Sequence, residues 1–307
     1  MAHAAREPER ERRGARVEPT LFPDPTALGR ALAVRIADGI ETASGSGRRY
    51  LLGCPGGRSA MTTYAELARE VERRHLDLSG LVIVMMDEYV EPGPTPGTFA
   101  WVDAELAHSC RRFGREVIAD PLSAAAGPGR GVSEEHLWVP DPAEPEEYER
   151  RLADAGGVDL FILASGASDG HVAFNPPGTP ADAPTRVVPL AETTRRDNLV
   201  TFPHLRTLDR VPHHGVGVGV ATIRRHSRSA VMVVLGADKA EAAARLAAAD
   251  HYDPTWPATV LSECAAPDLY VDQAAAVRLP ATQDSRTPNT SAGPEPTSLT
   301  AQGSEEN

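Results

Sequence analysis

The sequence predicts an α/β protein whose doubly wound, mostly parallel sheet is flanked by helices. Two observations carry this prediction. Short, continuous apolar runs such as 81–86 (LVIVMM) and 230–235 (AVMVVL) suit strands that are buried on both faces. Segments with the apolar spacing of a helix lie between these runs, and alternating strands and helices are typical of a parallel sheet with right-handed crossovers.

The elements can be assigned in chain order from these two patterns. The apolar runs that we expect to form strands lie at 50–53, 81–86, 158–163, 215–220, 230–235 and 269–271. The segments with helical spacing lie at 26–42, 61–74, 145–155 and 237–249.

Length and composition predict one folded domain with two loose ends. The 307 residues are 41% hydrophobic, which is enough for a sizeable core, and they contain no internal repeat. Segment 280–307 has no aromatic residue, valine or isoleucine, so it cannot bury enough apolar surface to offset the entropy of ordering. We therefore expect a flexible segment at 1–18, a single α/β domain at 19–279 and a disordered tail at 280–307.

Composition also narrows the classes of function. The net charge of −12 argues against a protein that binds nucleic acid. No stretch approaches the ~18 apolar residues of a membrane span, and the first residues lack the apolar core of a secretion signal. The three cysteines lie far apart without a CxxC spacing, which argues against a disulfide framework or a zinc cluster. We expect a soluble, cytoplasmic protein, and a homo-oligomer is compatible with the sequence.

Residues that could bind an anion or transfer a proton follow the first two predicted strands. The glycine-rich segment 53–59 (GCPGGRS) leads into a helix, where backbone N–H groups and the helix dipole can bind an anion. An ordinary tight turn explains this segment equally well. Asp87 and Glu88 follow the run 81–86, where a carboxylate could transfer protons in a cleft. A solvated turn is the alternative for that pair.

Two later strands are followed by further ionisable residues. Asp169 and His171 lie two residues apart after 158–163, and a carboxylate near an imidazole can fix its tautomer. Lys239, the only lysine among 31 basic residues, lies near a helix start, where a bound anion would offset the unfavourable dipole. Because ligands bind beyond the carboxyl ends of parallel strands, these residues predict a site for an anionic small molecule with acid–base chemistry.

Five segments resemble those of a known family. They are 61–64 (MTTY), 86–90 (MDEYV), 169–175 (DGHVAFN), 217–220 (GVGV) and 235–240 (LGADKA). In combination they resemble the glucosamine-6-phosphate deaminases and, more distantly, the 6-phosphogluconolactonases, over about 28–279. The resemblance implies a doubly wound α/β fold and a deaminase that forms fructose 6-phosphate and ammonia without a metal or a redox cofactor.

The resemblance also implies roles for individual residues. Asp87 matches the base that moves a proton between C2 and C1 of the open-chain sugar. His171 matches the residue that opens the pyranose ring, and Asp169 would orient it. The positions that match phosphate-binding residues are Gly56, Gly57, Arg58, Ser59, Arg186 and Lys239.

The chain departs from the family at several of these places. Pro176 stands where the deaminases have a Glu that joins the Asp/His pair, and Ser165 and Ala167 replace glycines of the preceding loop. Val200 stands where a phosphate-binding arginine is expected, whereas Arg58 stands where the deaminases have glycine. We hypothesise that Arg58 supplies the lost positive charge.

Two other functions remain open from the sequence. A hydrolase of a sugar lactone phosphate would use His171 as its base, and segment 176–180 (PPGTP) is similar to the lactonase loop. A sugar-phosphate-binding homologue without turnover would need the anion site but not Asp87. The adjacent pair His213 and His214 does not predict a metal site, because neighbouring residues in a loop do not readily face one ion.

Overall fold

The computed structural model describes residues 14–280 of the chain. Part of the expected flexible segment 1–18 lies outside the described residues. Almost all of the expected disordered tail 280–307 also lies outside them. Residues 14–18 are described and contact the domain. The Val17 side chain is buried, and the Ala15 N–H donates to the Ser262 carbonyl at 3.3 Å.

The centre of the molecule is a parallel sheet of seven strands, which confirms the predicted fold class. All neighbouring strands in it pair in parallel. Its strand order is β1 (Pro19–Phe22), β11 (Pro267–Asp272), β10 (Ala230–Val234), β7 (Leu160–Ala164), β2 (Tyr50–Cys54), β3 (Leu81–Met85) and β6 (Leu137–Trp138).

A second, antiparallel sheet lies beyond one end of the first and was not predicted. Its strand order is β5 (Phe99–Trp101), β4 (Asp87–Pro92), β9 (His214–Gly217) and β8 (Arg186–Pro189). The chain after β3 therefore continues into a strand, whereas the sequence left a solvated turn open as the alternative to a catalytic carboxylate there. The strand expected at 215–220 is also shorter, because β9 ends at Gly217 and a helix begins at Val220.

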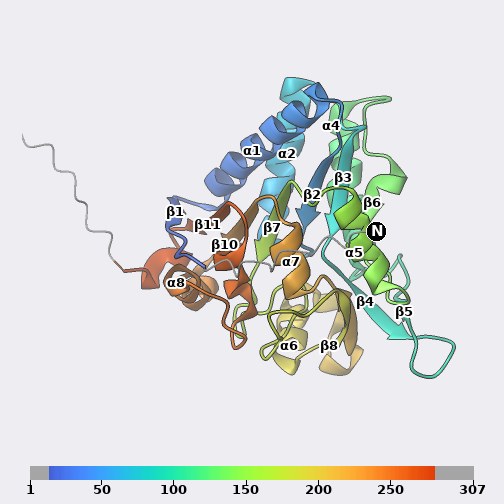
Figure 1. The fold of residues 1–307 in the computed structure, drawn as a ribbon, viewed down its shortest axis with the longest axis vertical. Coiled ribbons are helices and arrows are strands. Elements are labelled where there is room, and N and C mark those ends of the chain that lie inside the picture. Colours follow the sequence, from blue (N-terminus) through green and yellow to red (C-terminus); the bar gives the residue numbers. More distant parts are fainter. Residues whose placement is uncertain (1–13, 281–307) are drawn as a thin grey trace, which may run out of the picture.

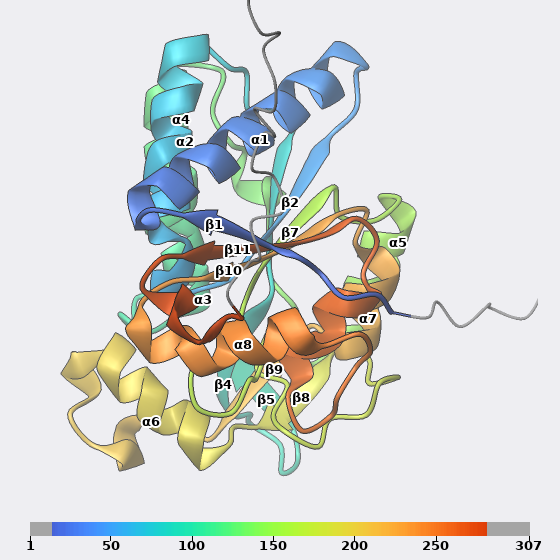
Figure 2. The ribbon, with the colours of Figure 1, turned by 90° about the vertical axis from the view of Figure 1, so that its left-hand side faces the viewer.

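Helices cover both faces of the parallel sheet (Figures 1 and 2). One face carries α1 (Pro25–Gly45), α2 (Met61–Arg74) and α4 (Asp120–Ala126), and the other carries α5 (Pro145–Asp154), α7 (Val220–His226) and α8 (Ala240–Ala248). The remaining α-helices of the described residues are α3 (Cys110–Phe113) and α6 (Glu192–Thr201). The apolar spacing of the sequence predicted α1, α2, α5 and α8. It did not predict the other four helices, which are α3, α4, α6 and α7. Within the described residues, no helix is long and apolar enough to cross a membrane.

Helix α1 shows why the periodic segments were easy to predict. The Asp24 side chain caps its N-terminus by accepting from the Ala27 N–H at 2.8 Å, and Pro25 occupies the first turn. Leu28, Leu32 and Ile36 recur at helical spacing and are fully buried against the sheet.

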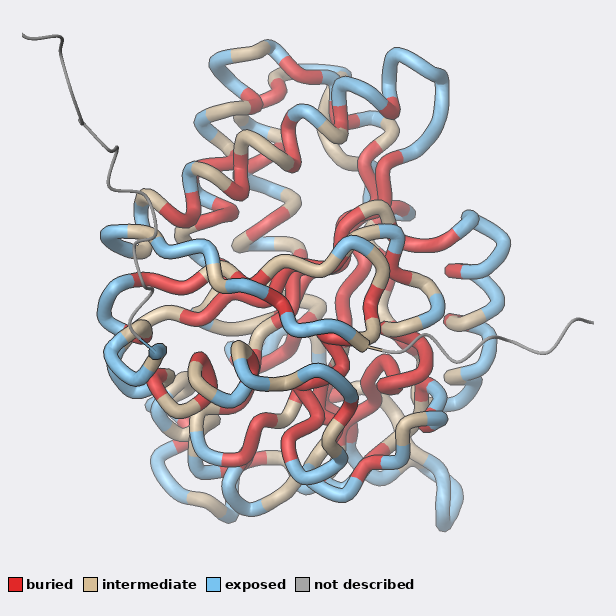
Figure 3. The backbone as a smooth tube through the Cα atoms, turned by 60° about the vertical axis from the view of Figure 1, so that its left-hand side comes forward, coloured by how far each residue is buried: buried red, intermediate tan, exposed pale blue. Residues whose placement is uncertain are grey.

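The core consists of two apolar clusters, one on each face of the sheet. Along β3, Leu81 and Ile83 belong to the cluster under α1 and α2, whereas Val82 and Val84 belong to the cluster under α5, α7 and α8. Figure 3 shows the buried backbone running through the middle of the molecule between exposed helices and loops. Burial on both faces explains why the strands read as continuous apolar runs.

Candidate active site

A cavity of about 310 Å³ lies at the carboxyl ends of the central parallel strands. Its lining includes residues that directly follow β2, β7 and β10, together with the start of β4 and part of α6. This is the edge where open α/β sheets bind their ligands. Of the nine candidate residues, the lining includes Gly56, Gly57, Arg58, Ser59, Asp87, His171 and Lys239.

Asp87 is the first residue of β4 and lies opposite Gly217 on β9. A side chain at Gly217 would place its Cβ 2.3 Å from the Ala173 carbonyl oxygen, so the close approach of these backbones needs glycine. The Cys110 thiol donates a long hydrogen bond to Asp87 Oδ1, with a sulfur–oxygen distance of 3.4 Å. The carboxylate is thereby held at the cavity wall.

The surroundings of Asp87 make it a stronger base than an ordinary aspartate. Burial of the carboxyl raises the pKa of Asp87 to about 6. The Cys110 hydrogen bond lowers this pKa, the neighbouring Glu88 charge raises it, and His171 lowers it. A base whose pKa lies near neutrality is suited to proton transfer.

Glu88 follows Asp87 but has a structural position that the sequence did not indicate. Successive side chains in a strand point to opposite faces, so Glu88 is turned away from the cavity and fully buried. Its carboxylate accepts from the N–H groups of Cys110 at 2.9 Å and Arg111 at 2.8 Å, and from the Ser109 hydroxyl at 2.8 Å. Glu88 therefore caps α3 and fixes Cys110 beside Asp87.

Asp169 and His171 form the predicted pair. Asp169 Oδ1 lies 2.7 Å from His171 Nδ1 and also accepts from the His171 backbone N–H at 3.1 Å. Its other oxygen accepts from the hydroxyls of Thr193 at 2.6 Å and Thr194 at 3.0 Å, both at the start of α6. Gly166 makes room for the pair, because a Cβ there would lie 2.3 Å from both Asp169 Oδ1 and His171 Nδ1.

These contacts fix the charge of Asp169. Burial of this carboxyl favours its neutral form, but the hydrogen bond and charge of His171 and the Thr193 hydroxyl outweigh that effect and hold the pKa of Asp169 well below its usual range. An ionised Asp169 in turn holds the imidazole in one orientation, with its remaining edge toward the cavity.

The chain after His171 turns sharply under strain. Ala173 and Phe174 have positive φ angles of 47° and 61°, which residues with a side chain rarely adopt. The buried Asn175 stabilises this turn, since its Nδ2 donates to the carbonyls of Val172 at 2.9 Å and Val218 at 2.7 Å.

Arg186 does not reach the cavity. Its guanidinium donates to Asn175 Oδ1 at 2.9 Å and to the Pro184 carbonyl at 3.1 Å, and it is not among the lining residues. The phosphate contact expected of Arg186 therefore finds no support in its position, because β8 carries it to the antiparallel sheet instead.

The same cavity also offers groups that can bind an anion. The loop after β2 lines it, with Gly57 at a positive φ of 83° and the exposed Arg58 beside it. Lys239 lies in the short 3₁₀ turn before α8, and its ammonium donates to the Ser165 carbonyl at 2.5 Å. Burial lowers the pKa of Lys239, and the nearby Arg58 adds to this effect. Two clustered cations are the expected environment of a phosphate.

Part of the lining escaped prediction from the sequence. His108, Cys110, Asp197, Asn198 and Thr201 all line the cavity. They lie on α3, on α6 or next to them, and these short segments carry no clear apolar periodicity. Only their spatial proximity to Asp87 and His171 identifies them.

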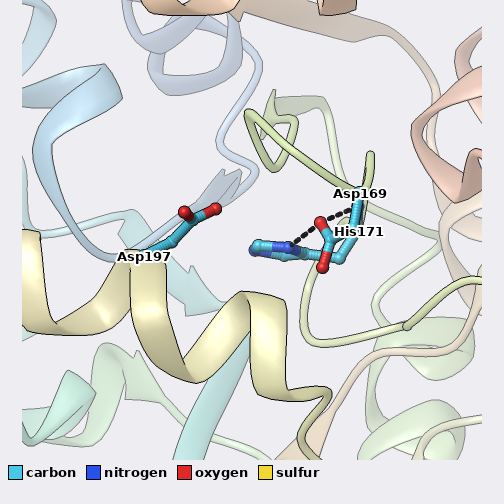
Figure 4. A group of neighbouring side chains, drawn as sticks. All are labelled: Asp169, His171 and Asp197. Atoms are coloured by element: carbon cyan, nitrogen blue, oxygen red, sulfur yellow. Dashed lines mark hydrogen bonds and ion pairs between the residues drawn. The ribbon is translucent and has the colours of Figure 1, made fainter. Parts of the chain in front are cut away.

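Asp169, His171 and Asp197 form a group that could be considered as a metal site. One donor atom from each lies within 4.8 Å of the others, and Figure 4 shows His171 between the two carboxylates. However, both oxygens of Asp169 already accept two hydrogen bonds each. This saturation fits a proton-transfer group better than a set of ligands for an ion.

Known proteins resemble this chain in sequence. The family model for glucosamine-6-phosphate isomerases/6-phosphogluconolactonase matches residues 23–270. A glucosamine-6-phosphate deaminase of Beutenbergia cavernae is 35% identical over 248 residues, which cover 80% of this chain and 88% of the relative. One of Mycolicibacterium smegmatis is 33% identical over 266 residues, covering 86% and 93%.

Solved structures agree on the fold. A monomeric glucosamine-6-phosphate deaminase superposes with a TM-score of 0.73 at 24% identity, covering 85% of this chain and 99% of that one. The 6-phosphogluconolactonase of Trypanosoma cruzi gives 0.62 at 16% identity, covering 87% and 98%. The family model and the curated relatives each span most of the sequence that folds into the two sheets. The chain therefore belongs to the glucosamine-6-phosphate isomerase/6-phosphogluconolactonase family.

Proposed function

We propose that this protein is an aldose–ketose isomerase and deaminase of an amino-sugar 6-phosphate, which converts glucosamine 6-phosphate and water into fructose 6-phosphate and ammonia. One observation carries the proposal: a carboxylate with a pKa of about 6, Asp87, lines the same cavity as His171, which Asp169 orients, and as the cations Arg58 and Lys239. The names of the relatives support the same activity.

The reaction assigns one task to each group. His171, oriented by Asp169, transfers a proton at the ring oxygen and opens the pyranose. Asp87 then removes the proton from C2 while the ammonium group of the sugar gives a proton to O1, which forms an enolamine with a C1=C2 double bond. Asp87 delivers its proton to C1, and the nitrogen lone pair forms a protonated C=N bond at C2. Water adds to C2, ammonia leaves, and the ketone of fructose 6-phosphate remains. Every atom comes from the sugar phosphate and one water, so the balance needs no oxidant or further reactant.

The phosphate would lie against the loop after β2 and near Lys239. Backbone N–H groups of Gly56, Gly57 and Ser59, the Arg58 guanidinium and the Lys239 ammonium are the donors that we propose there. Val200 lines the same cavity, and its apolar side chain supplies no charge to an anion. Arg58 is then the cation that compensates.

The decisive experiment is incubation of the full chain with glucosamine 6-phosphate while ammonia and fructose 6-phosphate are measured together. We expect both products in equal amounts. The variant Asp87→Asn should form neither, because the amide cannot accept the C2 proton.

Hydrolysis of 6-phosphogluconolactone is measured in parallel. A protein that hydrolyses the lactone, retains this activity as Asp87→Asn and releases no ammonia would be a lactonase. A protein that binds sugar phosphates and turns over neither compound would be a binding homologue. Either result would overturn the proposal.

A further inference from the structure

The free edge of His171 faces a second carboxylate across the cavity. The Nδ1 edge of the ring is occupied by Asp169 at 2.7 Å and by the Thr194 hydroxyl at 3.2 Å. Figure 4 shows the opposite end of the ring directed toward Asp197, which projects from α6. A ring nitrogen of His171 and a carboxylate oxygen of Asp197 lie within 4.8 Å of each other.

Asp197 has few partners of its own. The structure records one hydrogen bond to its carboxylate within the described residues, from the Ser168 hydroxyl at 3.3 Å. Asp197 lines the cavity beside Asn198 and Thr201 and is only half-buried. A carboxylate with spare acceptor capacity at the wall of a site is placed to accept a proton from a bound molecule.

We propose that Asp197 is a second proton-transfer group, which works opposite His171 in opening the sugar ring. This proposal rests on the function proposed above and extends it by one residue. It also gives a physical account of Pro176, which has no acid to offer and does not line the cavity. The missing carboxylate is supplied from α6 instead of from the loop after His171.

The chemistry of ring opening needs two groups at this spacing. In a cyclic hemiacetal, C1 carries both the ring oxygen O5 and the hydroxyl O1. Opening breaks the C1–O5 bond and forms the C1=O1 double bond, while a proton leaves O1 and another arrives at O5. Protonated His171 would donate to O5, and Asp197 would accept from O1. The proton then returns from Asp197 to His171, which regenerates both groups.

Asp197 is one of several charged groups that lie near Lys239. Burial lowers the pKa of Lys239, whereas the charges of Asp238, on the same 3₁₀ turn as Lys239, and of Asp197 raise it. The ammonium therefore lies close to both carboxylates. Arg58 adds positive charge from the loop after β2. A purely electrostatic role, in which Asp197 only balances Lys239, is therefore the alternative that the experiment must separate from proton transfer.

The experiment measures ring opening without consuming the sugar. In the Asp87→Asn background, the C2 proton stays in place, so exchange between the α and β anomers of glucosamine 6-phosphate can be followed by NMR. We expect Asp87→Asn to accelerate this exchange above its uncatalysed rate. The double variant with Asp197→Asn should lose at least about tenfold of that acceleration, as expected for removal of a proton-transfer group.

Two further measurements exclude a structural or electrostatic effect. The affinity for 2-amino-2-deoxyglucitol 6-phosphate, which has no ring to open, should be the same with and without Asp197→Asn. Added formate should restore exchange when Asp197→Ala replaces the carboxylate by a space, and should not affect the Asp197-containing protein. Asp209→Asn, an exposed change of equal charge in the segment after α6, should leave exchange unaltered.

The outcomes separate this inference from the proposed function. If Asp197→Asn leaves anomer exchange unchanged, the role of Asp197 is overturned. The same holds if exchange is lost, the phosphate affinity rises to match and formate does not restore exchange. Neither outcome affects the proposed deaminase function. Anomer exchange that depends on Asp197 in a protein that releases no ammonia leaves the inference standing and overturns the deaminase proposal. Absence of exchange in the Asp87→Asn protein overturns the inference directly.

Discussion

Two consecutive acids, Asp87 and Glu88, show how much the surroundings of a side chain decide. Their chemical groups are the same, yet one carboxylate lines the cavity and the other is buried under α3 with the donors of that helix. The alternation of a strand separates them by face. The ionisation of Asp87 has consequences for both stability and activity.

We predict that Asp87→Asn makes the protein more stable at neutral pH. The pKa of Asp87 is about 6 in the folded chain against 3.8 as its ordinary value, so the folded state disfavours the carboxylate. The stabilising contribution of the protonated acid is complete below pH 3.8 and is lost as pH rises through about 6. Urea denaturation should show the variant more stable by about 1–3 kcal/mol at high pH, with the difference shrinking toward pH 4.

The same ionisation should appear in the activity. Because the base must be ionised, kcat/KM of the unaltered protein should fall as pH drops below about 6. Asp209→Asn, an exposed change of the same kind, serves as the control for the stability measurement. A variant Asp87→Asn that is less stable than the parent at pH 8 would contradict this account of Asp87.

A second prediction for a single residue concerns the contact between Arg58 and the phosphate. Arg58→Ala should weaken the binding of glucosamine 6-phosphate or inorganic phosphate by about 10–100-fold, because one charge-assisted contact to the anion is lost. Isothermal titration would measure the affinity. Arg73→Ala, an exposed arginine on α2 that pairs with Glu70, provides the control. Equal affinities in both variants would show that Arg58 does not bind the phosphate.

At the scale of elements, the site depends on how loops leave the parallel strands. The loop after β7 carries Asp169 and His171, and α6 supplies Thr193 and Thr194 to hold them. The loop can close on this pair only because Gly166 has no side chain. Where the family has further glycines, Ser165 and Ala167 are tolerated and both line the cavity.

We therefore predict that Gly166→Ala disrupts the pair. The new Cβ would lie 2.3 Å from both Asp169 Oδ1 and His171 Nδ1, so one of them must move. A displacement of this size should lower kcat by about a hundredfold, measured as ammonia release. Gly45→Ala at the end of α1 is the matched control, since no atom lies within 4 Å of its added Cβ. Full activity in Gly166→Ala would mean that the loop has an alternative conformation.

At the scale of the whole molecule, one domain holds both sheets and the cavity between their elements. Two apolar clusters sandwich the parallel sheet, and the N-terminal strand β1 closes its edge against β11. Just before β1, Val17 packs into the apolar cluster under α5, α7 and α8. We therefore predict that the boundary of the domain lies nearer residue 14 than residue 19.

Truncation tests this boundary. Deletion of 1–13, of 281–307 or of both should leave the unfolding midpoint and kcat unchanged, because the described residues contain both clusters. Deletion of 1–18 should cost about 1–3 kcal/mol, since the burial of Val17 is lost. Thermal and urea unfolding would measure these effects. A destabilised protein ending at Pro280 would show that the domain extends beyond the expected limit.

The sequence by itself predicted the parallel sheet, the helices with clear apolar spacing and the four strand ends where ionisable or anion-binding residues lie. These features are local: apolar runs, helical spacing and glycine-rich turns follow from burial and backbone geometry within each segment. It therefore predicted that Asp87, Asp169, His171 and Lys239 lie at one edge of the sheet, and the first, third and fourth of these line one cavity.

Only the tertiary structure decided the rest. The antiparallel sheet, the separation of Asp87 from Glu88 and the position of Arg186 away from the cavity depend on pairing between segments far apart in the chain. Asp197 could not be recognised either, because no local pattern shows which residue of α6 will face His171. The physical reason is that a carboxylate becomes a proton-transfer group through its neighbours in space, and those neighbours are set by the fold.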